Sequence, residues 1–150
     1  MKKIKILALD QSTSCTGYAI GINNKLIESG KLKNNIANLD NMVDLIINLI
    51  DKVKPNIVLI EDIFYSPNGG KSFSTLARLQ GIIIGICKVK KIDYQIVNAR
   101  SWKKKFGIKA KKRNDQKIEC QTIVKEKFNI IVNTDEADAI GILNWFLNFE

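Results

Sequence analysis

Three apolar segments of this 150-residue chain carry carboxylates at one end. All three are rich in isoleucine, leucine or alanine, and the first two are typical of buried strands. The acids are Asp10 at the end of residues 4–10, Glu61 and Asp62 after residues 57–60, and Asp135, Glu136 and Asp138 at the start of the last apolar segment. A carboxylate at the tip of a central strand is costly unless something stabilises it. Three acidic ends on three elements therefore indicate one metal site.

Each acid also has a purely structural explanation. An isolated Asp10 would be interpreted as a turn-initiating residue that caps backbone amides. Asp135 and Glu136 would suit the positive end of a helix dipole, and Thr134 could cap that helix. Asp138 fits this explanation less well, because it shares a helix face with Asp135 and lies next to apolar positions. The combination favours a metal site over separate caps.

The absence of histidine narrows the chemistry that these acids can perform. It excludes a Ser-His triad, a histidine general base and histidine-ligated zinc. Cys15, Cys87 and Cys120 show no paired spacing, so we expect small buried or half-buried thiols in a reducing compartment. Mg²⁺ prefers carboxylate oxygens, and two such ions about 3.5–4 Å apart can clamp a phosphodiester. Three or four carboxylates from separate elements would balance their charge.

Positive charge gathers in one part of the sequence. The formal net charge is +9, and residues 88–113 hold eleven Lys and Arg against one Asp. Residues 100–113 carry eight cations and no acid, with Trp102 and Phe106 interleaved as expected anchors. A run of like charges is usually a solvated face, but a basic patch beside acidic metal ligands favours a polyanionic substrate. We expect phosphate contacts from Arg100, Lys103, Lys104, Lys105, Lys109, Lys111, Lys112 and Arg113.

The periodicity of apolar residues predicts a single α/β domain over residues 1–150. Predicted strands cover residues 4–10, 16–22, 25–32, 57–61 and 94–98, and predicted helices cover residues 39–54, 71–90, a segment from 114 and a segment from 134. Asn23-Asn24 is expected to form a hairpin turn. The crossover through the first helix predicts that the strand after it runs parallel to its partner. We expect no secretory leader and no apolar run as long as a membrane span.

The predicted helix 71–90 contains Gly81 and Gly85, four residues apart on one face. Each glycine costs about 1 kcal/mol relative to alanine within a helix, so close packing is the expected compensation. Two partners are possible. One is the domain's own sheet, and the other is a second copy of the same helix across a dimer axis.

These segments together resemble the RuvC-type Holliday junction resolvases of the ribonuclease H-like superfamily. The resemblance rests on Asp10 followed by Thr16-Gly17-Tyr18-Ala19, on Ile60-Glu61-Asp62-Ile63-Phe64, on Ala77-Arg78-Leu79-Gln80-Gly81, and on Asp135-Glu136-Ala137-Asp138-Ala139-Ile140. It covers nearly the whole chain. It implies a five-stranded mixed sheet flanked by helices, and a homodimer that makes paired nicks in four-way DNA junctions.

The resemblance also implies roles for individual residues. Asp10, Glu61, Asp135 and Asp138 match the family's four metal-binding acids, which implies two Mg²⁺ ions per site, with Mn²⁺ as a substitute. Phe64 matches an aromatic residue on the loop after the glutamate, which contacts DNA at the junction. The alternative for Phe64 is the commoner fate of a loop phenylalanine, which is to fold back and cap the core.

One departure from the family pattern follows the first acid. Cellular bacterial members usually have Pro-Gly there, whereas this chain has Gln11-Ser12. With the short length, this resembles the bacteriophage-encoded branch, which implies activity on branched DNA, forks included, in the cytoplasm of a bacterial host. It also puts in doubt any coupling to a branch-migration motor and any narrow sequence preference. Whether Asp62 or Glu136 joins the metal site stays open.

Two other functional classes are consistent with parts of the sequence. One is a nuclease of the same fold that acts on RNA or on RNA–DNA hybrids. The other is a non-catalytic nucleic-acid-binding module, or an ATP-binding relative of the actin-like ATPases, which share a first strand ending in Asp. The chain shows no second phosphate-loop glycine motif, which disfavours ATP binding, and the presence of all four acids disfavours a pure binding module.

Overall fold

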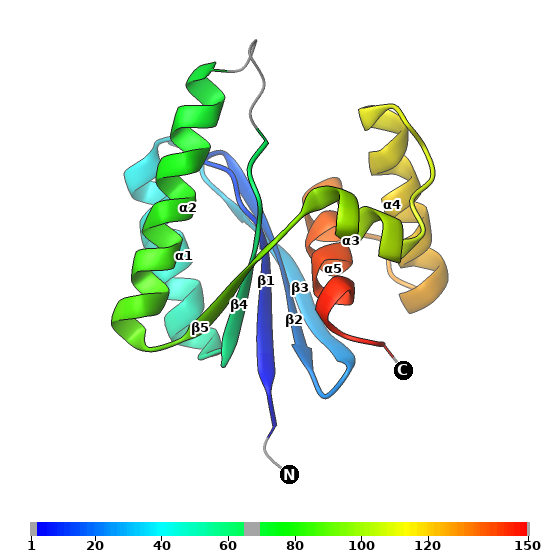
Figure 1. Ribbon diagram of the computed structural model, residues 1–150, viewed down its shortest axis with the longest axis horizontal. Coiled ribbons are helices and arrows are strands. Elements are labelled where there is room, and N and C mark those ends of the chain that lie inside the picture. The colour runs from blue at the N-terminus through cyan, green and yellow to red at the C-terminus, as the bar shows by residue number, and fades with distance from the viewer. Residues whose placement is uncertain (1–2, 65–69, 150) are drawn as a thin grey trace.

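A five-stranded mixed sheet with helices on both faces forms the centre of the computed structural model, which describes residues 3–64 and 70–149 (Figure 1). The strand order is β3-β2-β1-β4-β5. The elements are β1 (Lys5–Asp10), β2 (Cys15–Ile22), β3 (Lys25–Lys33), α1 (Leu39–Val53), β4 (Ile57–Glu61), α2 (Gly70–Lys90), β5 (Asp93–Val97), α3 (Ala99–Phe106), α4 (Arg113–Phe128) and α5 (Thr134–Phe146). The predicted α/β class and its five-stranded mixed sheet are confirmed.

The sheet combines a hairpin-linked half with a parallel half. β2 pairs antiparallel with both β1 and β3, whereas β4 pairs parallel with β1 and β5. Asn23 and Asn24 form the β2–β3 turn with φ angles of 50° and 63°, as expected for a tight hairpin. The parallel orientation predicted for β4 is confirmed, but its partner is β1. β3, which α1 connects to β4, lies beyond β2 at the edge.

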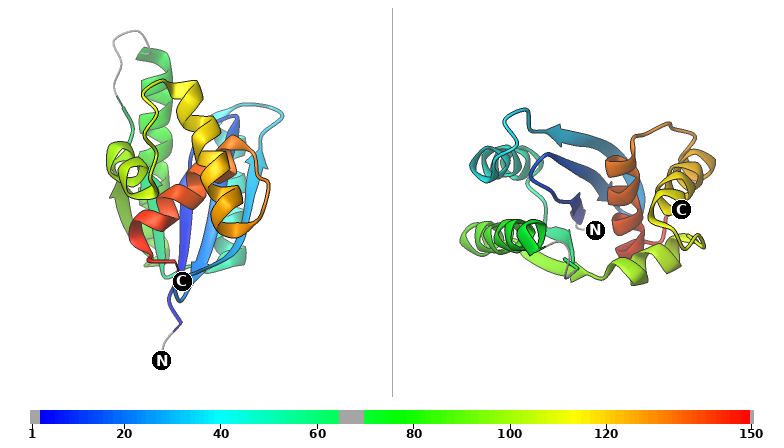
Figure 2. Two further views of the ribbon diagram at one scale, coloured as in Figure 1. Left: turned by 90° about the vertical axis from the view of Figure 1, so that its right-hand side faces the viewer. Right: turned by 90° about the horizontal axis from the view of Figure 1, so that it is seen from above.

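The alternation of side chains along β1 divides the core into two halves. Leu7 and Leu9 pack with α1 and α2 on one face, while Ile6 and Ala8 pack with the helices of the other face. Figure 2 shows that α5 lies between the sheet and α4. Because side chains alternate, Asp10 follows Ile6 and Ala8 onto the face that α5 covers.

The main departure from the predicted elements is α3, which forms inside the basic segment. Its N-cap is Asn98, whose side chain accepts a hydrogen bond from a backbone amide. Trp102 and Phe106, four residues apart, are its buried positions. Four of its eight residues are cations, which obscured this short helical period in the sequence. The expected cap of α5 is also wrong, because Asn133 and not Thr134 is its N-cap.

Helix α2 contacts the sheet along a narrow stripe. Leu79, Ile83 and Cys87 are fully buried, whereas Val89 near the end of the helix is 85% exposed. Residues 72–90 of α2 are long and apolar enough to cross a membrane, although the sequence was expected to contain no such run. Of this window, 17% is buried inside the protein. The buried residues Leu79, Ile83 and Cys87 pack on the sheet, which is typical of a core-facing helix. Much apolar surface of α2 is therefore left uncovered within one chain.

Candidate active site

Two carboxylates meet at the carboxyl ends of the central parallel strands. Asp10 ends β1 and Glu61 ends β4. The parallel register pairs Leu9 with Ile60, so the next residues along both strands are the two acids. Side-chain alternation then directs Asp10 and Glu61 to the face of the sheet that α5 covers. The convergence expected from the sequence is confirmed for this pair of strands.

Helix α5 brings two more carboxylates to the same place. Asp135 lies in its first turn, and Asp138 follows one turn later on the same face. Gly17 of β2, which pairs with Asp10, makes this approach possible. A Cβ at Gly17 would overlap the backbone carbonyl of Asp135. The absence of one side chain therefore allows the acidic start of α5 to rest directly on β2, beside the end of β1.

The carboxylates of this cluster are half-buried and lie close enough to repel one another. Burial raises the pKa of Asp10 well above its ordinary value, and the charges of Glu61, Asp138 and Asp135 raise it further. Burial also raises the pKa of Glu61 and of Asp138. The charged forms of Asp10, Glu61 and Asp138 are therefore poorly solvated, and a bound cation would stabilise them.

The donor set of this cluster fits a hard divalent cation. Carboxylate oxygens are the ligands that Mg²⁺ and Mn²⁺ take in proteins, and burial with mutual repulsion leaves a charge deficit that such ions would neutralise. Across residues 3–64 and 70–149, no three His, Cys, Asp or Glu side chains are already clustered tightly enough to hold one ion. The residues thus supply the charge and chemistry of a metal site, and ion binding would have to draw their side chains together.

Two thiols and an indole contact these acids. Trp102 of α3 donates its indole N–H to Glu61 Oε2 at 2.7 Å. The Cys120 thiol hydrogen bonds to Asp138, and the half-buried Cys15 thiol bonds to Asp135. Burial, followed by the contact with Asp135, raises the pKa of Cys15 to about 11. The expectation of unpaired, buried or half-buried thiols is confirmed.

The other two acids near the site are engaged elsewhere. Both Glu136 oxygens accept hydrogen bonds, one from Ser29 Oγ at 3.0 Å and one from Asn133 Nδ2 at 2.8 Å. The Asp62 side chain is exposed and accepts a hydrogen bond from the backbone amide of Ile63. Neither acid is directed to the cluster, which leaves Asp10, Glu61, Asp135 and Asp138 as the candidate ligands.

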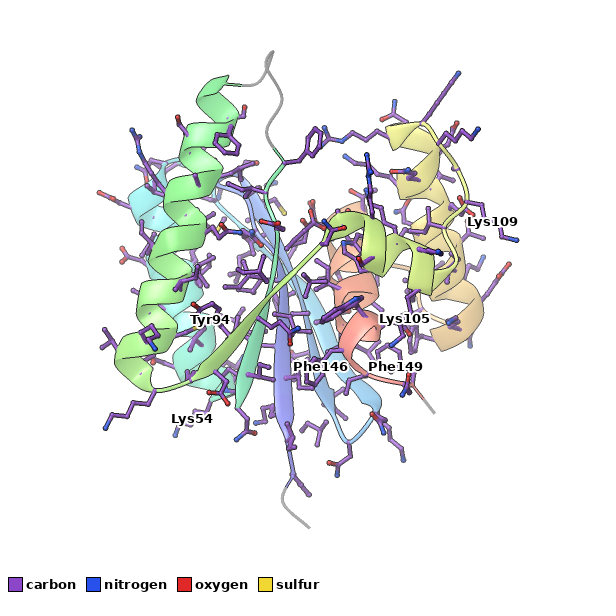
Figure 3. All side chains as sticks on the ribbon, in the orientation of Figure 1. Lys54, Tyr94, Lys105, Lys109, Phe146 and Phe149 are labelled. Carbon is purple, nitrogen blue, oxygen red and sulfur yellow. The ribbon has the colours of Figure 1, made fainter. Side chains whose placement is uncertain are left out.

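The basic segment splits into residues whose charge acts on the acids and residues that make contacts elsewhere. Burial is the largest influence on the pKa values of the acids, but Lys103 and Arg113 oppose it at Glu61, and Lys103 and Lys117 oppose it at Asp138. Lys105 instead donates to the backbone carbonyl of Trp145, at the far end of α5 (Figure 3). Lys109 lies at the outer side of α4 (Figure 3), where its backbone amide bonds to Glu119.

Sequence reasoning missed two residues of this site, Lys117 and the polar role of Trp102. Lys117 lies four residues after Arg113 on α4, so helical spacing from the end of the basic segment could have indicated it. Trp102 was correctly expected to anchor that segment. Its hydrogen bond to Glu61 spans 41 positions of the sequence and had no local signal. The remaining predicted phosphate contacts, Arg100, Lys104, Lys111 and Lys112, are exposed.

Phe64 lies in the open at the rim of the site. Its side chain is 81% exposed, three residues beyond Glu61. The alternative in which it caps the core is therefore wrong. The residues that follow it, 65–69, lie outside the described part of the chain, so the expected loop over 62–70 is described only at its edges.

Comparison with known proteins places this geometry in a family. The protein-family model described as "Crossover junction endodeoxyribonuclease RuvC" matches residues 6–143 of this chain. A protein with that description from Rickettsia akari is 26% identical over 146 residues, covering 91% of this chain and 92% of its own length. An uncharacterised protein of Ureaplasma parvum is also 26% identical, over 94% of this chain and 69% of its own length.

Solved structures share the fold at lower identity. RuvC from T. thermophilus in complex with a Holliday junction substrate superposes with a TM-score of 0.71 at 10% identity, covering 93% of this chain and 90% of the other. The Holliday junction resolvase of fowlpox virus has a TM-score of 0.68 at 15% identity, covering 95% and 96%. The yeast mitochondrial resolvase Ydc2 has a TM-score of 0.63 at 16% identity, covering 94% and 76%. The ribonuclease H-like architecture expected from the resemblance is confirmed.

Proposed function

Because the chain belongs to the RuvC family of crossover junction endodeoxyribonucleases, we propose that it resolves four-way DNA junctions by paired nicks that depend on divalent metal ions. The observation that carries this proposal is the cluster of Asp10, Glu61 and Asp138, half-buried together at one edge of the sheet, where desolvation raises the pKa of each carboxyl. A stably folded protein keeps such a repulsive cluster where a cation or a reaction uses it.

The four carboxylates would hold Mg²⁺, two ions per site, with Mn²⁺ as a substitute. When bound, such ions activate a water molecule and stabilise charge on the phosphodiester. Asp10 and Glu61 come from rigid strand ends, which suits them to set the position of the scissile phosphate. The charges of Lys103, Lys117 and Arg113 act on these acids, so these three cations are the best placed to neutralise phosphates next to the site.

The direct test is cleavage of a synthetic four-way junction beside matched substrates, with and without Mg²⁺. The panel includes a linear duplex of the same sequence, a three-way fork and an RNA–DNA hybrid. We expect symmetric nicks in the junction that disappear with EDTA and return with Mg²⁺ or Mn²⁺. Preferred cutting of the hybrid would instead support the ribonuclease alternative. The phage-encoded origin, the bacterial cytoplasm as location, and the single-domain boundary of 1–150 stay predictions.

Phe64→Ala is expected to keep the melting temperature of the wild type, because its side chain is 81% exposed. We propose that Phe64 stacks on a base at the branch point, where an aromatic contact stabilises by about 1–3 kcal/mol per base. The variant should therefore bind junctions nearly normally but cut them roughly 10- to 100-fold more slowly. A junction with unpaired bases at the crossover should restore much of the rate. Slow cutting of both junctions would remove the stacking role.

Charge removal is expected to separate the two parts of the basic segment. A triple variant of Lys103, Arg113 and Lys117 to Ala should lower the slope of log affinity against log salt by about 0.9 for each phosphate that is no longer neutralised. Lys105→Ala with Lys109→Ala is the matched control, since both lie away from the acids. A slope that stays equal to that of the wild type in both variants would show that the whole segment is a solvated face.

We also propose that the chain acts as a homodimer, since paired nicks need two sites. Gly81 and Gly85 face outward with nothing within 4 Å of an added Cβ, so the alternative in which these two glycines pack onto the domain's own sheet is wrong. Gly81→Arg should therefore fold normally yet elute as a monomer in light scattering, while wild type and the control Ile131→Arg elute as dimers. Ile131 suits the control because it is 85% exposed, outside α2. A monomeric wild type with full paired nicking would refute the dimer.

A further inference from the structure

Trp102 combines complete burial with a single polar contact of its indole. Its side chain is 0% exposed, and its indole N–H donates to Glu61 Oε2 at 2.7 Å. A buried indole N–H needs an acceptor, and here the acceptor is a carboxylate of the cluster itself. The contact joins α3 to the end of β4. It commits one oxygen of Glu61 to the protein and leaves Oε1 for another ligand.

The position of this indole is set by packing from a second helix. Gly141 of α5 lies against its ring, and a Cβ there would overlap the Trp102 side chain. Phe106 lines the same contact, with a ring carbon 3.4 Å from that Cβ position. The Nζ of Lys103 also lies over the ring, 5.6 Å from its centroid. The indole is thus wedged between α3 and α5, so the direction of its N–H is determined by the core.

A fixed donor matters at this residue because Glu61 is repelled by its neighbours. Asp138 lies close enough to oppose the charge of Glu61, and Asp10 is also close by. A free glutamate has three side-chain torsions and would rotate away from these charges. A hydrogen bond that is already made holds the carboxylate in place before any ion arrives, and so avoids an entropy cost during binding.

We propose that Trp102 is a positioning residue that holds the Glu61 carboxylate in the orientation required for metal binding. The inference rests on the proposed function, since it gives Glu61 the role of a metal ligand. Hydrogen-bond partners of metal ligands typically contribute 10- to 100-fold to metal affinity or activity. Trp102 belongs to this class because it contacts the ligand and not the ion.

The first experiment follows the indole N–H signals by NMR in the full chain without DNA. The chain has two tryptophans, Trp102 and Trp145. Titration with Mg²⁺ should shift the Trp102 signal, because its acceptor gains a cation. The signal of Trp145 is the internal control, because this residue lies ten positions after Asp135 along α5, about 15 Å away. A Trp102 signal that does not move at saturating Mg²⁺ would overturn the proposal.

The second experiment removes the N–H while keeping the shape of the side chain. Benzothienylalanine incorporated at position 102 replaces the N–H with sulfur, and Trp102→Phe is the simpler variant. Both should raise the Mg²⁺ concentration for half-maximal cleavage 10- to 100-fold, while KM for the junction stays within twofold. Phe106→Leu is the matched control, because it loosens the same α3–α5 contact without removing a donor, and its Mg²⁺ dependence should match the wild type.

The outcomes separate the inference from the proposed function. If the benzothienyl protein keeps the Mg²⁺ dependence of the wild type, or if Phe106→Leu shifts it equally, Trp102 is only a core residue and the proposal fails. If the wild-type indole signal responds to Mg²⁺ while no branched DNA is cut, the proposed function fails and the positioning role stands.

Discussion

Asp10→Asn is expected to abolish cleavage of a four-way junction while leaving junction binding intact or tighter. The side chain ends a central strand and is surrounded by Glu61, Asp135 and Asp138. Losing its charge would weaken ion binding and remove several kcal/mol of transition-state stabilisation, so we expect a fall of roughly 10³-fold or more. Binding should persist because one charge that repels phosphate has gone.

The same substitution is expected to stabilise the metal-free protein at neutral pH. Burial raises the folded-state pKa of Asp10 above its unfolded value, so the folded state binds its proton more tightly. The contribution of this carboxyl to stability is therefore fully present at low pH and is lost as pH rises through the folded pKa. Asparagine carries no charge at any pH, so the variant does not lose stability in this way as pH rises. Each kcal/mol recovered corresponds to about 2–4 °C in melting temperature for a chain of this size.

Three measurements on one preparation check this prediction. They are gel shift with a junction, a nicking assay with Mg²⁺, and thermal unfolding in EDTA at pH 7.5 and at pH 5. The wild type should gain stability on acidification relative to Asp10→Asn, and the two should converge as Asp10 becomes protonated. Asp44→Asn, an exposed acid on α1, is the control and should change none of the three. Cleavage at the wild-type rate by Asp10→Asn would remove this residue from the site.

Gly17→Ala should have the second-largest effect, on both stability and activity. The added Cβ would overlap the backbone carbonyl of Asp135, and a backbone atom of a packed helix cannot move aside cheaply. Overpacking typically costs about 1–3 kcal/mol and more where backbone must shift, so we expect a loss of at least about 3 kcal/mol. In the fraction that folds, α5 would be displaced from β2, carrying Asp135 and Asp138 away from Asp10.

Gly81→Ala controls for the added methyl group, which meets open space there within one chain. Because Gly81 also lies in the proposed dimer contact, the oligomeric state of this variant is compared with the wild type by light scattering. The substitution should raise helix stability by up to about 1 kcal/mol and leave the Mg²⁺ dependence unchanged. Chemical denaturation of the free proteins and Mg²⁺ titration of cleavage measure the two effects separately. A Gly17→Ala protein with wild-type stability and activity would show that α5 does not rest on β2.

Much of the fold could be predicted because it depends on local sequence patterns, namely the spacing of apolar residues and the residues that form turns. Alternation and apolar content identified all five strands, and the Asn23-Asn24 pair identified the turn of the hairpin. The strand ends carried the acids, so Asp10 and Glu61 could be expected to meet if their strands were neighbours, and the pairing of β1 with β4 makes them so. These features depend on residues close in sequence, whose backbone and side-chain geometry repeats with a fixed period.

What the tertiary structure decided were the contacts between distant segments. Which lysines face the acids depends on how α3 and α4 dock, and that docking separates Lys103 from Lys105 two positions later. The contact of α5 with β2 depends on Gly17, more than a hundred residues earlier in the chain. The indole that donates to Glu61 belongs to Trp102 of α3. Such contacts follow from the packing of whole elements, so a single sequence carries no periodic signal for them. Periodicity determined where the carboxylates could gather, and packing decided which side chains surround them.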